Sequence, residues 1–418
     1  MSNTVRKPAP PKTDPQAKRA ILALAREALF AVPAGKISGG VDWKAVFQES
    51  RAQHLVALLS DGAQKQELPA DVKQQWKAEA DRMLLYNVHS QMWHTRVQKE
   101  MDKAGIPCVV IKGLASASYY PRPILRGAGD VDVLVRKEDM EAGGRVLRGL
   151  GLRPGKDATR HEAHVAYYKP GVDVELHWWV SGTPAGERGR VIQDAFADLH
   201  AASVPYTCES GTCRIPSVLH HAMILLIHTA KHLVGSGTAL RHLCDWAVFA
   251  HRVGEDVFEN ELRAPLKEMG LWQLAQIFTD LSCQHLGLPQ QRWAGVTDRK
   301  YADDLLDDFF ASGYFGRKDR TRGYESLWYI DINTRSTAGS AKMRNLIRRI
   351  NTYTRKQMPV TARVPLLLPA GWVYFVGRYL LRVRKGLRPR FHLSGIKNAG
   401  KRSELYTAWR LFEPEEET

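Results

Sequence analysis

The chain is 418 residues long, enough for two or three folded units, and its 44% hydrophobic and 25% charged residues exclude a chain that is disordered throughout. The formal net charge of +16 is regional, because residues 341–402 contain sixteen Lys or Arg and no Asp or Glu. We therefore expect an anionic partner, such as lipid headgroups, a nucleic acid or an acidic polymer, to meet the C-terminal part.

The N-terminal segment, residues 1–16, is polar and rich in proline, and it lacks the apolar stretch of a signal peptide. It is predicted to be a disordered leader. The five cysteines form no CxxC pair, and only Cys208 and Cys213 are near enough in sequence to close a small loop. We expect a reducing, cytoplasmic setting, to which the basic C-terminal region could add peripheral contact with the inner face of the membrane.

Two helical regions are predicted on either side of a different, central pattern. Apolar residues recur at three- and four-residue spacing over 17–105 and again over 216–311. The stretch between them, 106–215, carries short β-branched runs instead. Residues 312–340 are rich in Gly, Arg, Asp and Thr and are predicted to be a loop, which leaves 341–418 as a basic C-terminal region.

The central region is predicted to be a compact α+β unit. CVVIKG at 108–113 and VDVLV at 131–135 are typical of buried strands, and a helix is expected over 137–151. AHVAYYK and VDVELHWWV are typical of paired strands joined through Pro170-Gly171. The fold class expected is therefore α+β, with a small mixed β-sheet core embedded between N-terminal and C-terminal helical regions.

Two aspartates, Asp130 and Asp132, stand at the start of the strand over 131–135. Side chains two residues apart on a strand point to the same face. Two carboxylates roughly 5 Å apart repel by about 3 kcal/mol at an effective dielectric constant of about 20, so the pair predicts a bound cation. Oxygen ligands at this spacing suit Mg²⁺, and nucleotidyl transfer needs such a cluster because negative charge builds on the phosphate oxygens.

A third carboxylate should come from a neighbouring strand. In VDVELHWWV, Asp173 and Glu175 share one face, and either could complete the metal site, with Glu175 favoured. The alternative is that both acids are charges on the solvent side of an edge strand.

A candidate phosphate-binding segment lies upstream of the aspartates. Lys112 and Gly113 end one strand and precede a helix, where glycine allows close approach to the backbone and free N–H groups favour anions. Arg126, four residues before Asp130, is placed to neutralise phosphate charge. A Lys-Gly pair is usually a turn and an arginine is usually solvated. The pattern is specific only because these residues precede the acidic strands in a fixed order along the chain.

In these residues the sequence resembles the largely uncharacterised nucleotidyltransferase family related to the polymerase-β superfamily, often found near surface-polysaccharide genes. The matching segments lie within residues 20–310: GIPCVVIKGLASASYY, Arg126 with GDVDVLV, VELHWW, and IHTAKHL with RHLCDWA. The resemblance implies a mixed sheet flanked by helices, with Mg²⁺ or Mn²⁺ on Asp130, Asp132 and Glu175, and an NTP beside Lys112, Gly113 and Arg126.

One feature departs from the broader superfamily. Leu114 follows Gly113 where that superfamily usually has serine, so a contact from serine to phosphate is missing. Ser116 or Ser118 could substitute for it. The departure bears on catalytic competence more than on the fold.

Several histidines follow the central region. His228 and His232 share a helix face, the spacing of a two-histidine metal site, but no third ligand is evident and HEAH at 161–164 has the wrong spacing for a zinc helix. Ordinary helix histidines are the plainest interpretation. The resemblance instead favours His228 and His232, with Lys231, facing the nucleotide. Arg241 and Asp245, also four residues apart, are predicted to form an ion pair.

The basic region contains a mostly apolar run from Pro365 to Leu381, interrupted by proline, glycine and Arg378. Its length is marginal for spanning a bilayer, and its aromatic residues alternate with cations as in helices that lie at a membrane interface. The alternatives are a buried amphipathic helix with a solvated basic face, and binding of a nucleic acid or another polyanion.

These features together predict a metal-dependent nucleotidyltransferase that transfers a nucleoside monophosphate from an NTP to an unknown hydroxyl or phosphate acceptor. Two other classes stay open. One is a non-catalytic nucleotide-binding or scaffold protein that keeps the fold. The other is an RNA-modifying transferase that uses the basic C-terminus, although RNP-type and zinc-finger signatures are absent.

Overall fold

The computed structural model describes residues 13–155, 163–184, 186–235, 237–295, 299–314, 318, 347–348, 350–355, 357–385 and 411–413. Most of the predicted leader and of the predicted loop over 312–340 lies outside this part, as do residues 341–346 and 386–402 of the basic segment.

The N-terminal region is helical, as its apolar spacing predicts. Its helices are α1 (Pro15–Phe30), α2 (Trp43–Ala52), α3 (Val56–Gln64) and the long α4 (Ala70–Lys103). Helix α1 begins inside the segment predicted as a leader, because the side chain of Asp14 caps its first turn by accepting from two backbone N–H groups. The leader boundary at residue 16 is therefore too late.

The central region forms the mixed sheet that the sequence predicts. Its strands are β1 (Cys108–Val110), β2 (Val131–Val135), β3 (Arg153–Pro154), β4 (His164–Lys169) and β5 (Val172–His177), in the spatial order β1-β2-β5-β4-β3. Only the β2–β5 pair is parallel, and the other neighbours are antiparallel. Helices α5 (Leu114–Ala117) and α6 (Met140–Gly149) lie in the connections on either side of β2.

The two faces of this sheet bury different kinds of side chain. Val131 and Val133 of β2 and Val174 of β5 point to the face covered by α4 and α6, where they pack in one apolar cluster with Val97 and Leu147. Because side chains alternate along a strand, the residues between these valines point to the opposite face. That second face carries the polar residues of the candidate site.

After the sheet come α7 (Glu187–Asp194), α8 (Leu199–Ala202) and a two-stranded hairpin of β6 (Val204–Cys208) and β7 (Gly211–Ile215). The five cysteines are free thiols. In the hairpin Cys208 lies opposite Gly211 and Cys213 opposite Tyr206, so the strand register does not bring the two cysteines together.

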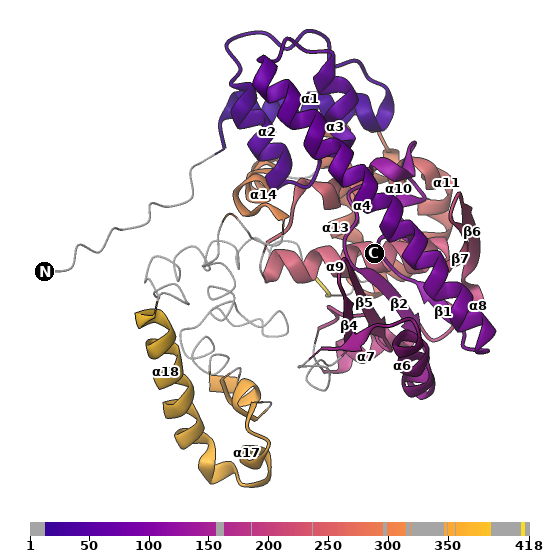
Figure 1. Cartoon of the computed structure of the whole chain (residues 1–418), viewed down its shortest axis with the longest axis vertical. Helices are drawn as coiled ribbons and strands as arrows, with labels where there is room; N and C mark the ends of the chain where they lie inside the picture. Colours follow the sequence, from indigo (N-terminus) through magenta and orange to yellow (C-terminus); the bar gives the residue numbers. More distant parts are fainter. Residues whose placement is uncertain are drawn as a thin grey trace, which may run out of the picture.

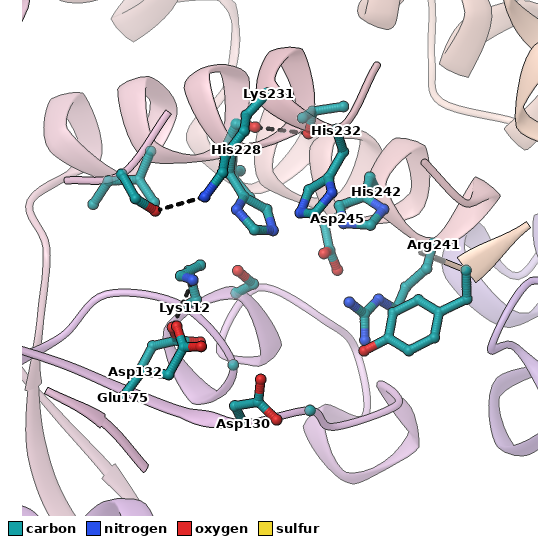
Figure 2. Close-up of a pocket in the computed structure, with 18 of the residues that line it drawn as sticks. Lys112, Asp130, Asp132, Glu175, His228, Lys231, His232, Arg241, His242 and Asp245 are labelled. Carbon is teal, nitrogen blue, oxygen red and sulfur yellow. Dashed lines mark hydrogen bonds and ion pairs between the residues drawn. The ribbon is translucent and has the colours of Figure 1, made fainter. Parts of the chain in front are cut away.

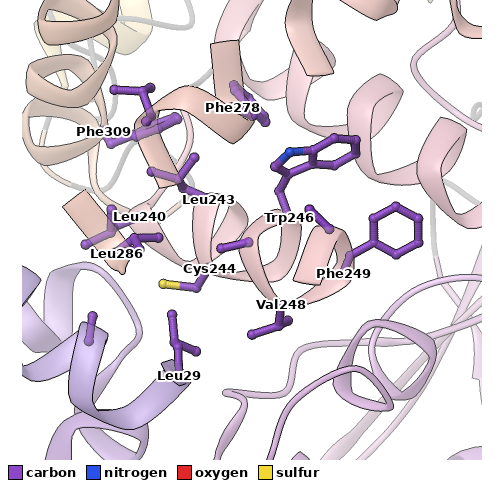
Figure 3. Packing of buried hydrophobic residues seen from close by; sticks show 14 of the residues in the cluster. Leu29, Leu240, Leu243, Cys244, Trp246, Val248, Phe249, Phe278, Leu286 and Phe309 are labelled. Atoms are coloured by element: carbon purple, nitrogen blue, oxygen red, sulfur yellow. The ribbon is translucent and has the colours of Figure 1, made fainter. Parts of the chain in front are cut away.

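A second helical layer contains the largest part of the hydrophobic core. Helices α9 (Val218–Val234) and α10 (Leu240–Val253) are followed by α11 (Glu255–Val257), α12 (Arg263–Glu268), α13 (Trp272–Leu281) and α14 (Arg299–Ser312). Figure 3 shows the buried residues of α10 packed between α13 and α14 on one side and Leu29 of α1 on the other. Helix α9 crosses beside the strands β2, β4 and β5 (Figure 1), so the N-terminal helices, the sheet and the second layer share one body.

The basic C-terminal region contributes α17 (Val360–Arg363) and α18 (Leu368–Arg384), drawn in gold apart from the body in Figure 1. In the described ranges, no helix combines the length and the apolarity that crossing a bilayer requires. Further along, Leu411 and Phe412 are buried, and the backbone N–H of Phe412 donates to the carbonyl oxygen of Gly270 at 2.9 Å.

Candidate active site

The carboxylates of Asp132 and Glu175 lie side by side on the polar face of the sheet. Asp132 on β2 and Glu175 on β5 are direct partners in the parallel register, and Asp130 precedes the first residue of β2. All three line one pocket. Asp173 shares the strand face of Glu175 but is exposed. The structure thus brings together the three acids that the sequence singles out, with Glu175 on the neighbouring strand.

Two nitrogen-bearing side chains of the protein already contact Asp132. The ammonium of Lys112 lies 2.5 Å from Asp132 Oδ1, and Nε2 of His177 lies 3.0 Å from the same oxygen. Burial alone would raise the pKa of Asp132, but Lys112 and His177 hold this pKa far below its usual range. Lys112 thus supplies a positive charge that the sequence argument, which considered the carboxylates of Asp130 and Asp132 alone, did not count.

Asp130 has a different environment. Burial, the largest cause, and the neighbouring charges of Asp132 and Glu175 together raise the pKa of Asp130 to about 6. Three carboxylates thus face the Lys112 ammonium, with the Lys231 ammonium across the pocket. Such a donor set fits a hard divalent cation, whose charge would stabilise the ionised form of Asp130.

Gly113 occupies a backbone conformation that suits glycine, with φ +54°. A Cβ at this position would lie 2.8 Å from Nε2 of the buried His94, so a side chain does not fit beneath the turn. Of the two serines considered as substitutes for the missing phosphate contact, Ser116 lines the pocket, whereas the Ser118 hydroxyl donates to the carbonyl oxygen of Ala115 at 2.7 Å.

Arg126 also lines the pocket, but its guanidinium is held by a carboxylate. Its Nε and Nη2 each donate to one oxygen of Asp245 at 2.8 Å, and the Tyr120 hydroxyl donates to the same carboxylate. The predicted ion pair between Arg241 and Asp245 is wrong, because Arg241 instead donates to the carbonyl oxygen of Gly127 at 2.8 Å. The pair Arg126–Asp245 is buried and ties the loop before β2 to α10.

The wall opposite the carboxylates is rich in nitrogen. Figure 2 shows His228, Lys231 and His232 of α9, with His242 of α10, across the pocket from Asp130, Asp132 and Glu175. Burial lowers the pKa of His228 and of His232, and each neighbouring imidazole or lysine lowers it further. The sequence predicted His228 and His232 at the nucleotide, and the structure brings both to the pocket that contains the acids.

The sequence argument assigned no role at this site to two further histidines of the pocket, His164 and His242, or to His177, which is buried behind Asp132. His242 is the neighbour of Arg241 in RHLCDWA, and its ring centroid lies 5.6 Å from that of His228. His177 follows Glu175 by two residues, so the alternation that selected Asp173 and Glu175 could have selected it as well. His164 was considered only as part of a zinc helix, whereas it begins β4 and lies opposite His177 in the register.

With this geometry established, comparison with known families gives one result. A model described as uncharacterised nucleotidyltransferase matches residues 39–287, which include the sheet, α9 and α10. The chain belongs to this nucleotidyltransferase family. No curated protein and no solved structure gives a significant match to the chain.

Proposed function

We propose that this pocket catalyses metal-dependent nucleotidyl transfer. The observation that carries the proposal is the placement of Asp132 and Glu175 in register on adjacent parallel strands, with Asp130 beside them, opposite a wall of cationic and imidazole groups. Such a pocket has one side suited to a divalent cation and one suited to a polyphosphate. The family membership supports an NTP as the co-substrate.

In the reaction proposed, an acceptor oxygen attacks the α-phosphorus of the NTP, the bond to the β-phosphate oxygen breaks, and pyrophosphate leaves. Mg²⁺ or Mn²⁺, when bound, would neutralise the phosphate oxygens as their charge grows. Asp130 and Asp132 would hold the cation, and Glu175 would share it and lie where the proton of the acceptor is released. The acceptor is a hydroxyl or phosphate group, for example on a sugar, a lipid-linked intermediate, a small molecule or a protein.

The cationic wall supports binding of the triphosphate. Lys231 lies across the pocket from the acids and hydrogen bonds only weakly to Ser181, at 3.3 Å. His242 also lines the pocket, and its buried Nε2 has no hydrogen-bond partner among the described residues. We assign Lys112 and Gly113 to the phosphate side of the pocket, and Arg126 to holding the loop before β2 in place through Asp245.

The C-terminal helices support a second, separable part of the proposal, peripheral contact with an anionic membrane surface through residues 341–402. Large apolar side chains of α18 are exposed, among them Val373, Val376 and Leu380, and the same segment has no acidic residue. Exposed apolar and cationic groups on one helix are typical of an interfacial helix.

Transfer of radioactive label tests the catalytic proposal. Full-length protein is incubated with each α-³²P-labelled NTP, Mg²⁺ or Mn²⁺, and cell extract as the source of acceptor. Wild type should transfer label and release pyrophosphate, and Asp132→Asn and Glu175→Gln should each reduce transfer by at least about 100-fold, the loss expected when transition-state charge is no longer stabilised. Asp173→Asn is the matched control on the same strand face and should retain activity.

Two outcomes would favour the other classes. NTP could raise the melting temperature of wild type but not of the variants, with no release of pyrophosphate. This result would indicate a nucleotide-binding protein without catalysis. Label transferred to RNA, and lost on deletion of 341–402 or at high salt, would indicate an RNA-modifying transferase.

A further inference from the structure

A cluster of two imidazoles and a carboxylate lies on β4 and β5 at the edge of the acidic site. His164, Glu175 and His177 each offer one ligand atom, and these atoms all lie within 4.8 Å of one another. His164 and His177 are direct partners in the antiparallel register, so the two rings are fixed by rigid backbone on adjacent strands. No loop has to move to bring the three side chains together.

The distances within the cluster have the values expected around one metal ion. Nε2 of His177 lies 3.2 Å from Glu175 Oε2 and 3.0 Å from Asp132 Oδ1, and Nε2 of His164 lies 3.4 Å from Glu175 Oε1. With metal–ligand bonds of about 2.1 Å, neighbouring donor atoms are about 3.0 Å apart in an octahedron and about 3.4 Å apart in a tetrahedron. These three nitrogen–oxygen distances thus lie in the range found between neighbouring ligands of one ion.

Charge favours a cation at the same place. Asp130, Asp132 and Glu175 bring three negative charges, against which Lys112 is the nearby ammonium. His177 is fully buried, its Nε2 faces two carboxylates, and its Nδ1 has no hydrogen-bond partner among the described residues. A cation shared by Nε2 of His177 and the two carboxylates would satisfy these three ligand atoms together.

We propose that His164 and His177 are nitrogen ligands of the metal ion bound at Glu175. The inference rests on the proposed function only in that both use Glu175 and Asp132. It gives the site a mixed nitrogen and oxygen ligand set, in contrast to the all-oxygen set predicted from the carboxylates alone. Imidazole ligands favour ions such as Mn²⁺, Co²⁺ and Zn²⁺ over Mg²⁺, which prefers oxygen ligands. The protein should therefore bind Mn²⁺ more tightly than Mg²⁺.

Electron paramagnetic resonance of bound Mn²⁺ tests the ligand set without any requirement for activity. Full-length protein is titrated with Mn²⁺ alone, and the electron spin echo of the bound ion is examined for modulation by directly coordinated ¹⁴N. Wild type should show this modulation. His164→Ala should reduce its depth and weaken Mn²⁺ affinity at least about 10-fold, with a smaller effect on Mg²⁺, since the loss of groups that merely orient a ligand already costs about 10-fold or more.

Matched variants separate the proposal from the alternatives. His251→Ala removes an exposed imidazole of α10 and should leave both modulation and affinity unchanged. If His177→Ala does not fold, the wild-type spectrum and His164→Ala still decide the question. Mn²⁺ bound without ¹⁴N modulation, with affinity lost only in Asp132→Asn, would overturn the imidazole ligands while leaving nucleotidyl transfer intact. Modulation without any transfer from NTP would support the ligands and count against the proposed reaction.

Discussion

At the scale of single residues, the carboxylate of Asp132 is held in place by two neighbours of different origin. Lys112 follows β1 and His177 ends β5, so the antiparallel and the parallel neighbours of β2 each bring one nitrogen to the same oxygen. Asp132→Asn would leave the Lys112 ammonium without its carboxylate partner. This variant should therefore destabilise the metal-free protein. Repulsion between the carboxylates of Asp130 and Asp132, considered alone, would predict the opposite, a stabilisation.

Asp245 and Arg126 provide a prediction about stability. The carboxylate and the guanidinium are nearly inaccessible to solvent, with side-chain exposures of 2% and 6%. Removing one partner of such a pair leaves a buried charge uncompensated, so Asp245→Asn or Arg126→Met should lower the free energy of unfolding by about 3–5 kcal/mol. Urea denaturation at pH 7.5 measures this loss. Arg122→Met, which removes an exposed pair with Asp61, is the control and should cost at most about 1 kcal/mol.

The same pair has a defined pH dependence. Burial would raise the pKa of Asp245, but Arg126 lowers this pKa to about 2. Because the pKa in the unfolded chain is about 3.9, the contribution of the pair is complete above that value and is lost as the pH falls toward 2.

In the urea experiment at pH 7.5, equal losses of stability in Asp245→Asn and Arg122→Met would show that the buried pair contributes no more than a surface one.

At the scale of helices and strands, α9 carries one face to the pocket and another into the core. His221, on the core face, is stacked on Tyr119 with ring centroids 5.0 Å apart, and neither ring nitrogen has a hydrogen-bond partner among the described residues. Burial lowers the pKa of His221 to about 3. A histidine that stays neutral in the folded protein but is protonated in the unfolded chain costs stability as the pH falls below about 6.5.

We predict that His221→Phe is nearly neutral for stability at pH 7.5 and stabilising at pH 5. One proton taken up only on unfolding costs about 1.4 kcal/mol per pH unit, so the variant should gain about 2 kcal/mol over wild type between these two pH values. Urea denaturation at each pH measures the difference. His251→Phe, at an exposed position of α10, should have the same pH dependence of stability as wild type. Parallel curves for wild type and His221→Phe would contradict the prediction.

The helices and strands themselves follow closely from local sequence. The helical regions, the strand over 131–135 and the hairpin turned at Pro170-Gly171 were all predictable from periodicity and turn residues. The partners of buried charges were not, because Arg126 and Asp245 are 119 residues apart. Helical spacing offered Arg241 as a local partner for Asp245, and tertiary packing chose a different one.

The candidate site shows the same division between local pattern and register. Alternation along a strand places Asp173, Glu175 and His177 on one face, but it does not say which of the two carboxylates lies opposite Asp132. The parallel register decides this by pairing Asp132 with Glu175. The role of His164 depends on a second register, between β4 and β5, and no motif in the sequence signals it.

At the scale of the whole molecule, the apolar surface of α18 gives a prediction about membranes. The aromatic residues of the run from Pro365 to Leu381 include Trp372 and Phe375, but Trp372 donates to Asn351 at 3.0 Å and Phe375 packs on Tyr353. Val373 and Leu380 are instead 73% and 58% exposed. Full-length protein should co-sediment with anionic vesicles at low salt, and Val373→Ser/Leu380→Ser should reduce the bound fraction several-fold.

The control for this experiment is Leu85→Ser, which removes an equally exposed leucine, 74% accessible, from α4 of the body. It should bind vesicles as wild type does. Equal binding to neutral and anionic vesicles, or none to either, would count against membrane contact by the basic region.

The attachment of Phe412 to Gly270 changes what the basic region can reach. After α14, Lys318 still pairs with Glu49 of α2, and Leu411 and Phe412 are again buried in the body, so the described helices α17 and α18 lie between two attached points of the chain. The tip of a tail can extend to its full contour length, whereas the middle of an anchored insertion can extend to half of it. The two attachments therefore give α18 a shorter reach from the body than it would have on a free tail of the same length.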